Sequence, residues 1–315
     1  MNLIFRVKNK IIHLFQQLYR FLFHRRYGEI LMLHRVVEKR SLLEDNCRLE
    51  VTPAFLEKTI LKYIDAGYQL VSLDEVQKQV ESRKSNRHKF VCFTLDDGYA
   101  DNYELAYPVF KKHNCPFAIY IATDFPDKKA LLWHYHLQDI LLENDKVQFN
   151  GMEYDCSNLK KKNHAFRKIR SQLFTSDFEK KLTVLIQFLK ENANVIRHDV
   201  NVLNWKQISE LASDPLCTIG AHTVSHIAIS MLNDEGVKKE LMDGKKIIED
   251  KIKKPVKHFS YPFGRWDDRV AQLANEYYST ATTTDPGFIR EEDILDRLKR
   301  NELIEKSIIN EPTYY

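Results

Sequence analysis

Residues 93–98 read Phe93-Thr94-Leu95-Asp96-Asp97-Gly98. They continue an apolar run that begins at residue 90, which predicts a buried strand ending in two adjacent carboxylates and a glycine turn. Successive side chains of a strand point to opposite faces, so the two aspartates can take separate roles. Taken alone, Asp-Asp-Gly is also ordinary turn chemistry, in which aspartate side chains cap the backbone.

A second motif, His222-Thr223-Val224-Ser225-His226, pairs two histidines behind the apolar residues 218–221. Four residues apart on one face of a helical turn, two imidazoles can share a metal ion. One carboxylate and two histidines form the ligand set of an open metal site, which leaves the other carboxylate free to act as a base. Together the two motifs predict metal-assisted hydrolysis.

The remaining chain alternates between short apolar runs and amphipathic stretches. Strands are predicted at residues 30–33, 69–73, 90–94, 116–123, 218–221, 258–261 and 279–283. Helices are predicted at residues 53–67, 74–81, 101–113, 205–212, 234–251 and 267–277. This βαβ repetition is typical of a parallel sheet and favours a closed or nearly closed α/β barrel.

The polar candidates fall where predicted strands end. His34 follows the first strand, the two aspartates follow the third, and His222 and the turn Tyr261-Pro262-Phe263-Gly264 follow two later ones. Parallel α/β barrels gather their catalytic groups at the carboxyl ends of the strands. The four segments are therefore expected to meet on one rim.

These residues resemble the motifs of the polysaccharide deacetylases, carbohydrate esterase family 4 with its NodB homology domain. The matching segments are Thr94-Leu95-Asp96-Asp97-Gly98, the histidine motif, the Tyr261 turn and the opening Leu31-Met32-Leu33-His34-Arg35-Val36. The resemblance covers roughly residues 29–300 apart from an insertion. It implies a distorted (β/α) barrel that removes N- or O-acetyl groups from a glycan with a divalent metal, usually Zn2+.

Transferred position by position, the resemblance implies that Asp97, His222 and His226 bind the metal. Asp96 would be the general base that deprotonates the attacking water. The sequence does not show which groups orient the two histidines from behind.

The third motif departs from the family pattern. The resemblance implies that the backbone N–H near Phe263 helps to stabilise the oxyanion, with Tyr261 and Pro262 in the same substrate-facing turn. The family often places an arginine three residues before the position of Phe263, where it holds the base. Here Ser260 occupies that position, so another group must orient Asp96.

The general acid also departs from the pattern, because no histidine follows His258. His34 is the natural replacement, since deacetylases of the poly-N-acetylglucosamine type look similar in using an early histidine. Histidine exchanges protons near neutral pH, which suits protonation of the leaving group. The alternative is a structural histidine bonded to the barrel.

The barrel is assigned to residues 29–124 and 205–300, and residues 125–204 to a helical insertion that could cover the site. We interpret its opening residues 133–136 as a buried anchor in preference to a stacking platform for sugars. The lysine and arginine residues within 160–170 are interpreted as a solvated helix face in preference to a clamp for an anionic substrate. Residues 301–315 form a tail. Asp296 and Arg300 are interpreted as a structural ion pair.

Residues 1–28 carry six basic and no acidic residues, with apolar positions at helical spacing. They predict an amphipathic helix that either contacts an anionic membrane surface through residues 1–26 or packs on the body or another subunit. No cleavable signal peptide is expected. The five widely spaced cysteines are typical of a reducing compartment. The N-terminal segment and the lack of an export signal predict a cytoplasmic location, with peripheral contact at the inner face of the membrane if the segment binds lipid.

The rest of the chain is nearly neutral, with 42 basic and 44 acidic residues, which argues against nucleic-acid binding. Two other functions stay open: hydrolysis of a non-sugar amide on the same fold, and a catalytically silent glycan-binding module. The sequence does not indicate an oligomeric state.

Overall fold

The computed structural model describes residues 28–82, 88–129, 132–173, 178–195, 201–290 and 293–306. The predicted N-terminal amphipathic helix, and with it the membrane contact, lies outside the described residues. Among the helices that are described, none has the length and apolarity needed to cross a bilayer. None of the five cysteines is paired with another.

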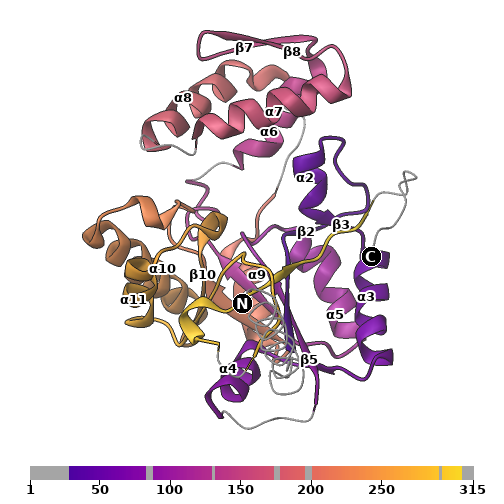
Figure 1. Cartoon of the computed structure of the whole chain (residues 1–315), viewed down its shortest axis with the longest axis vertical. Helices are drawn as coiled ribbons and strands as arrows, with labels where there is room; N and C mark the ends of the chain where they lie inside the picture. The colour runs from indigo at the N-terminus through magenta and orange to yellow at the C-terminus, as the bar shows by residue number, and fades with distance from the viewer. Residues whose placement is uncertain are drawn as a thin grey trace, which may run out of the picture.

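The centre of the molecule is an eight-stranded, all-parallel sheet (Figure 1). Its strands are β1 (Gly28–Leu33), β4 (Gln69–Leu70), β5 (Phe90–Leu95), β6 (Phe117–Ile121), β9 (Cys217–Ala221), β10 (His258–Ser260), β11 (Thr280–Thr282) and β12 (Asn301–Glu302). Their order is β11-β10-β9-β6-β5-β1-β12, and β4 pairs with β5.

The C-terminal segment connects the two ends of this curled sheet. Leu298 bridges to Thr282 of β11, and three residues later Asn301 pairs with Leu31 of β1. The predicted α/β barrel is thereby confirmed as a curled parallel sheet. Strand β12 lies in the range that the sequence analysis assigned to the tail.

Most helices that follow the strands cover the outer face of the sheet. They are α3 (Pro53–Asp65), the π-helical segment Asn102–Ala106 with α5 (Tyr107–Lys112), α9 (Trp205–Ser213), α10 (Asp234–Ile252) and α11 (Asp268–Asn275). Helix α4 (Leu73–Ser82) instead packs Val76 and Val80 against residues of the inner face such as Cys92 and Tyr120. Thr52 caps α3 by accepting from the N–H of Phe55, and Pro53 occupies its first turn. A short helix α2 (Glu44–Arg48) and the two-stranded pair β2 (Arg35–Val36) and β3 (Glu50–Val51) follow β1.

Side chains alternate between the two faces of the sheet, as strand geometry requires. Odd-numbered residues such as Phe93, Ile119 and Ile219 join the core beneath the helices. Even-numbered residues such as Cys92 and Tyr120 belong to a separate inner cluster. The alternation carries polar residues at the strand ends, Asp96 among them, to the inner side of the sheet.

The insertion forms a lobe of its own at one end of the molecule, above the sheet in Figure 1. It contains α6 (Trp133–Glu143), the hairpin β7 (Lys146–Phe149) and β8 (Met152–Asp155), α7 (Leu159–Leu173) and α8 (Phe178–Glu191). Its core is separate from that of the barrel and includes Trp133, Ile140, Phe149, Phe166 and Leu185. The described part of this segment thus combines helices with an antiparallel hairpin, and the hairpin was not predicted from the sequence.

Candidate active site

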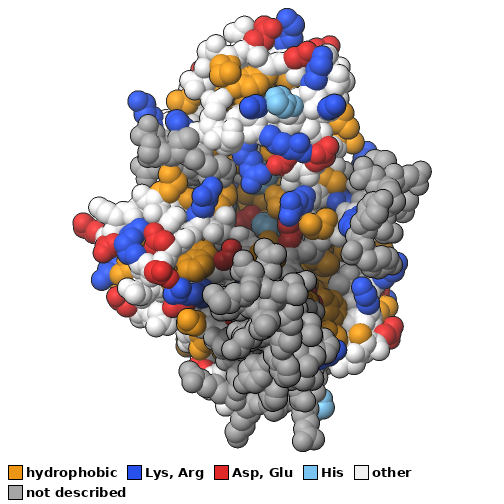
Figure 2. All heavy atoms as spheres, viewed as in Figure 1, with side chains coloured by type: hydrophobic (Ala, Val, Ile, Leu, Met, Phe, Trp, Pro, Cys, Tyr) orange, Lys and Arg blue, Asp and Glu red, His pale blue; other side chains and the backbone are white. Residues whose placement is uncertain are grey.

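A cavity of about 670 Å³ opens between the carboxyl ends of the strands and the insertion. In Figure 2 it is the hollow below the upper lobe, with basic side chains, drawn in blue, around its mouth. It is lined by residues from β1, α2, the β5 loop, the insertion, the β9 loop and the C-terminal segment. The expected meeting of distant segments on one rim is therefore observed.

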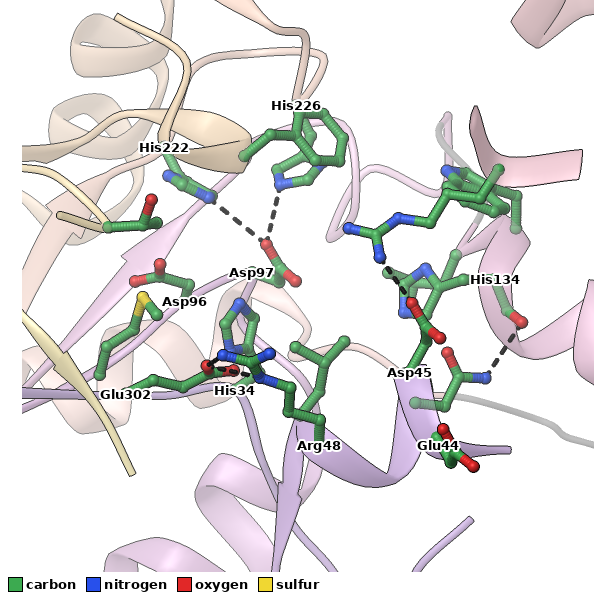
Figure 3. A pocket seen from close by; sticks show the side chains of 18 of the residues that line it. His34, Glu44, Asp45, Arg48, Asp96, Asp97, His134, His222, His226 and Glu302 are labelled. Carbon is green, nitrogen blue, oxygen red and sulfur yellow. Dashed lines mark hydrogen bonds and ion pairs between the residues drawn. The ribbon is translucent and has the colours of Figure 1, made fainter. Parts of the chain in front are cut away.

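Asp97, His222 and His226 come together in this cavity (Figure 3). The Oδ1 atom of Asp97 lies 3.0 Å from Nε2 of His226 and 3.5 Å from Nε2 of His222. Burial would raise the pKa of Asp97, but the two histidines hold it well below its ordinary value. Three ligand atoms within 4.8 Å of one another fit a divalent cation.

The orientation of His222 supports that fit. Its Nδ1 lies 2.7 Å from the carbonyl oxygen of Ser260, so Nδ1–H donates to the backbone and the lone pair of Nε2 faces Asp97. Oδ1 of Asp97 is buried without a hydrogen-bond donor among the described residues. A carboxylate oxygen and an imidazole lone pair repel each other unless a proton or a cation lies between them, so the arrangement suits a metal.

The histidine motif is not helical, and the predicted helical turn is wrong. Residues 222–228 form an irregular loop in which Thr223 and His226 have positive φ values of 67° and 53°. Glu240 of α10 holds this loop: its Oε2 accepts from the N–H groups of Val224 and Ser225, and its Oε1 accepts from the Ser225 hydroxyl. Glu240 carries no motif signal and was not predicted from the sequence.

Arg300 orients the predicted base. Its Nη1 and Nη2 lie 2.7 Å from Oδ1 and Oδ2 of Asp96, and Nη2 also donates to the Ser260 hydroxyl at 2.8 Å. Arg300 is fully buried and Asp96 is 3% exposed. Burial raises the pKa of Asp96, but Arg300 outweighs it and brings the pKa below its ordinary value, so Asp96 is ionised.

This arrangement corrects the interpretation of Arg300 as the structural partner of Asp296. Asp296 instead pairs with Arg297 at 2.7 Å. Arg300 supplies, from the C-terminal segment, the guanidinium that the family often provides in the third motif. Ser260, at that motif position, receives a hydrogen bond from it.

His34 lies across Asp97 from the two other histidines in Figure 3. It is half-buried and lines the cavity. Its backbone carbonyl accepts from Asn102, which fixes the end of β1. No described residue hydrogen-bonds to its ring nitrogens, so the imidazole can meet a substrate.

Of the predicted substrate-facing turn, only Phe263 lines the cavity. Its backbone is left-handed, with φ 56°, and its ring centroid lies 4.5 Å from that of His226. Tyr261 is buried, stacks on Trp266 and donates its hydroxyl to the Asp296 carbonyl at 2.7 Å. Pro262 is also buried, so the structure places both side chains in the fold and outside the cavity wall.

The insertion supplies part of the cavity wall through Trp133, His134, Phe166, Arg167 and Arg170. Trp133 stacks on Phe166 and is 9% exposed, which agrees with its reading as an anchor. Arg167 and Arg170 are exposed, as the reading of a solvated helix face expects, and they also pair with Asp45 of α2 at 2.9 and 2.8 Å.

Comparison with known proteins agrees with this geometry. The sequence profile of the family described as polysaccharide deacetylase matches residues 83–281. YxkH of Bacillus subtilis (strain 168), provisionally named a polysaccharide deacetylase, is 23% identical over 259 residues, which cover 82% of this chain and 64% of YxkH. The chain thus spans less than two thirds of the length of that relative.

Two solved structures share the fold. The Streptococcus pyogenes deacetylase PplD in complex with acetate has a TM-score of 0.61 and 19% identity, covering 88% of this chain and 92% of that one. IcaB from Ammonifex degensii has a TM-score of 0.59 and 16% identity, covering 89% and 92%.

The profile match spans more than half of the residues and contains both aspartates and both histidines of the cavity. On that basis, the chain belongs to the polysaccharide deacetylase family.

Proposed function

We propose that this chain is a metal-dependent hydrolase that removes acetyl groups from a glycan. The observation that carries the proposal is the position of the Arg300-paired Asp96 directly beside Asp97, His222 and His226 in one cavity. An ionised base next to a three-residue ligand set is the equipment that hydrolysis of an amide or ester requires.

Asp97, His222 and His226 would hold the divalent cation, and Zn2+ suits a site of two imidazoles and one carboxylate. When bound, such a cation supplies Lewis-acid polarisation of the acetyl carbonyl and acidifies the attacking water. The backbone at Phe263, on the wall of the cavity, is the proposed second stabiliser of the oxyanion.

The protein residues move the protons. Asp96 accepts a proton from the water whose oxygen attacks the acetyl carbon, and Arg300 keeps the carboxylate oriented. His34 gives a proton to the nitrogen or oxygen of the sugar as its bond to the acetyl carbon breaks. The products are acetate and a free amine or hydroxyl on the glycan.

The substrate we propose is a surface polysaccharide or a lipid-linked glycan. A cavity of about 670 Å³ is large enough for a short saccharide segment. The basic, apolar residues 1–26 support action near an anionic membrane. Sedimentation with vesicles containing an anionic lipid tests the location: absence of binding by the full chain would contradict it, and binding that persists after removal of residues 1–26 would contradict the role of that segment.

Metal content and acetate release test the proposed reaction together. Wild-type protein and His222→Ala are loaded with zinc, measured by mass spectrometry and assayed on an N-acetylated chito-oligosaccharide. We expect near-stoichiometric zinc and acetate release in the wild type, and loss of both in the variant. His164→Ala, an exposed histidine of α7, is the control and should match the wild type.

Asp96→Asn separates the base from the metal site. It should retain zinc while acetate release falls by about 10²–10⁴-fold, the usual contribution of a general base. Zinc binding without acetate release in the wild type would direct the search to other acetylated glycans or to non-sugar amides. Failure to bind zinc would favour a glycan-binding module.

A further inference from the structure

The first turn of α6 brings His134 of the insertion into the wall of the cavity. His134 lines the same cavity as His34, Asp97 and His226. In Figure 3, His134 lies on the side of the cavity opposite His222. Its backbone carbonyl accepts from Asn46 of α2 at 3.1 Å, which fixes the start of the helix. The proposed metal set and the proposed proton transfers leave this imidazole without a role.

Tyr99 holds the ring of His134 in place. The Tyr99 hydroxyl lies 3.2 Å from Nε2 of His134. Tyr99 lies two residues after Asp97 and is completely buried. Its ring is fixed by the Arg35 guanidinium, 5.2 Å from the ring centroid, and by an edge contact with Tyr135 at 6.2 Å.

This hydrogen bond sets the tautomer of His134. Within the described chain, Nε2 of His134 is the only hydrogen-bond partner of the Tyr99 hydroxyl, and donation by the O–H is the direction that satisfies this buried hydroxyl proton. Burial lowers the pKa of His134 to about 3, and the imidazole is therefore neutral at neutral pH. A neutral ring that accepts at Nε2 carries its proton on Nδ1.

The remaining nitrogen is accessible. Nδ1 of His134 bonds to no other described residue, and the atom is not fully buried. The residue is half-buried and lines the cavity, where a bound molecule could reach this N–H. A fixed donor at the edge of a cavity suits an oxygen atom of a bound molecule.

We propose that His134 binds the substrate, its Nδ1–H donating to a hydroxyl or acetyl oxygen of the acetylated sugar, with Tyr99 as the positioning residue behind it. This inference rests on the proposed function and makes the insertion a part of the active site. Because the contact forms in the ground state as well as in the transition state, its loss should act mainly on KM.

The test combines kinetics and direct binding on zinc-loaded protein. His134→Phe keeps a ring and removes both nitrogens, Tyr99→Phe removes only the hydroxyl, and a double variant carries both changes. His164→Phe, exposed on the same insertion, is the matched control. The probe is N-acetylated chitotetraose, assayed for acetate release and, in an Asp96→Asn background, for its Kd by calorimetry.

We expect kcat/KM of His134→Phe to fall about threefold to tenfold, the value of one neutral hydrogen bond, with full zinc content and a matching rise in Kd. Tyr99→Phe should lose less. The double variant should be no worse than His134→Phe, because Tyr99 acts through His134. His134→Gln, which keeps an N–H donor, should recover part of the loss.

The outcomes separate this inference from the proposed function. Unchanged kcat/KM and Kd in His134→Phe, or additive losses in the double variant, would overturn the role of His134 while leaving deacetylation intact. Binding that depends on His134 without acetate release from the wild type would support the contact and contradict the reaction. Absence of binding by the wild type would reject both.

Discussion

Arg300 and Asp96 form the most consequential residue pair in the molecule. Their bidentate contact is buried completely, and Thr94 and Ser260 provide further hydrogen-bonding groups to the guanidinium. A buried carboxylate is expensive to keep ionised unless such a partner compensates its lost hydration. The pair therefore combines two roles, orientation of the base and maintenance of its charge.

Replacing Arg300 with Met should impair both roles. Without the guanidinium, burial dominates and the pKa of Asp96 rises, so the base becomes protonated at a higher pH. The acid limb of the kcat/KM profile should move to higher pH, with kcat/KM at neutral pH about 10- to 100-fold lower. An unpaired buried carboxylate should also cost about 3–5 kcal/mol in urea unfolding.

Arg297→Met is the control for that variant, because Arg297 pairs with Asp268 and Asp296 away from the cavity. It should leave the acid limb in place. If the limb did not move in Arg300→Met either, Arg300 would have no part in setting the ionisation of the base.

His34 is expected to matter for turnover and not for metal binding. It lines the cavity but lies outside the three-residue ligand set. His34→Gln should therefore keep its zinc while kcat falls by about 10²–10⁴-fold, through loss of the general acid. Steady-state kinetics and metal analysis on one preparation check this, with His113→Gln, a helix-end histidine paired with Glu57, as control. Turnover at the wild-type rate would leave His34 a structural residue.

At the scale of elements, the loops at the strand ends carry unusual backbone conformations. Asp97, Thr223, His226 and Phe263 all have positive φ, between 53° and 73°. Non-glycine residues enter this region at a cost, so the surrounding structure must hold them there. Glu240 does so for the histidine loop, by accepting from two backbone N–H groups and one hydroxyl.

Glu240→Gln should loosen the histidine loop, because the amide can no longer accept at both ends. We expect an approximately tenfold weaker zinc affinity, as is usual when a group supporting the ligands is lost. A competition titration with a chromogenic chelator measures it. Glu235→Gln, exposed on the same helix, should bind zinc as the wild type does, and equal affinity in both variants would remove Glu240 from the support of the site.

On the scale of the whole molecule, buried amides attach the insertion to α2. The side-chain oxygen of Gln138 accepts from the Leu43 N–H and from Asn46, and that of Asn163 accepts from the Glu44 N–H. All three amide side chains are at most 4% exposed. The arginine–carboxylate pairs outside them are about half-exposed and therefore contribute less.

Gln138→Leu should thus destabilise the protein more than Arg167→Ala. The first leaves buried donors unsatisfied, at a cost of about 1–3 kcal/mol, whereas the second removes an exposed pair worth about 0–1 kcal/mol. Urea unfolding of the two variants beside the wild type provides the comparison. The reverse order would mean that the surface ion pairs hold the insertion in place.

Local pattern determined much of this molecule. Short apolar runs predicted the strands of the sheet, with the exception of β12, and amphipathic stretches predicted the helices that follow them. Both signals depend on neighbours within a few residues. The motifs around Asp96, Asp97, His222 and His226 identified the family and the residues that meet in the cavity. The hairpin β7–β8 escaped prediction, since nothing in its short sequence distinguished it from the helical stretches around it.

Only the tertiary structure determined which groups support and orient those residues. Arg300 is 204 positions from Asp96, and the two meet only because the C-terminal segment connects β11 to β1. Glu240, Tyr99 and the carbonyl of Ser260 likewise reach their partners through the packing of separate elements. Contacts between distant positions follow from sheet closure and helix docking, and no local sequence signal records them.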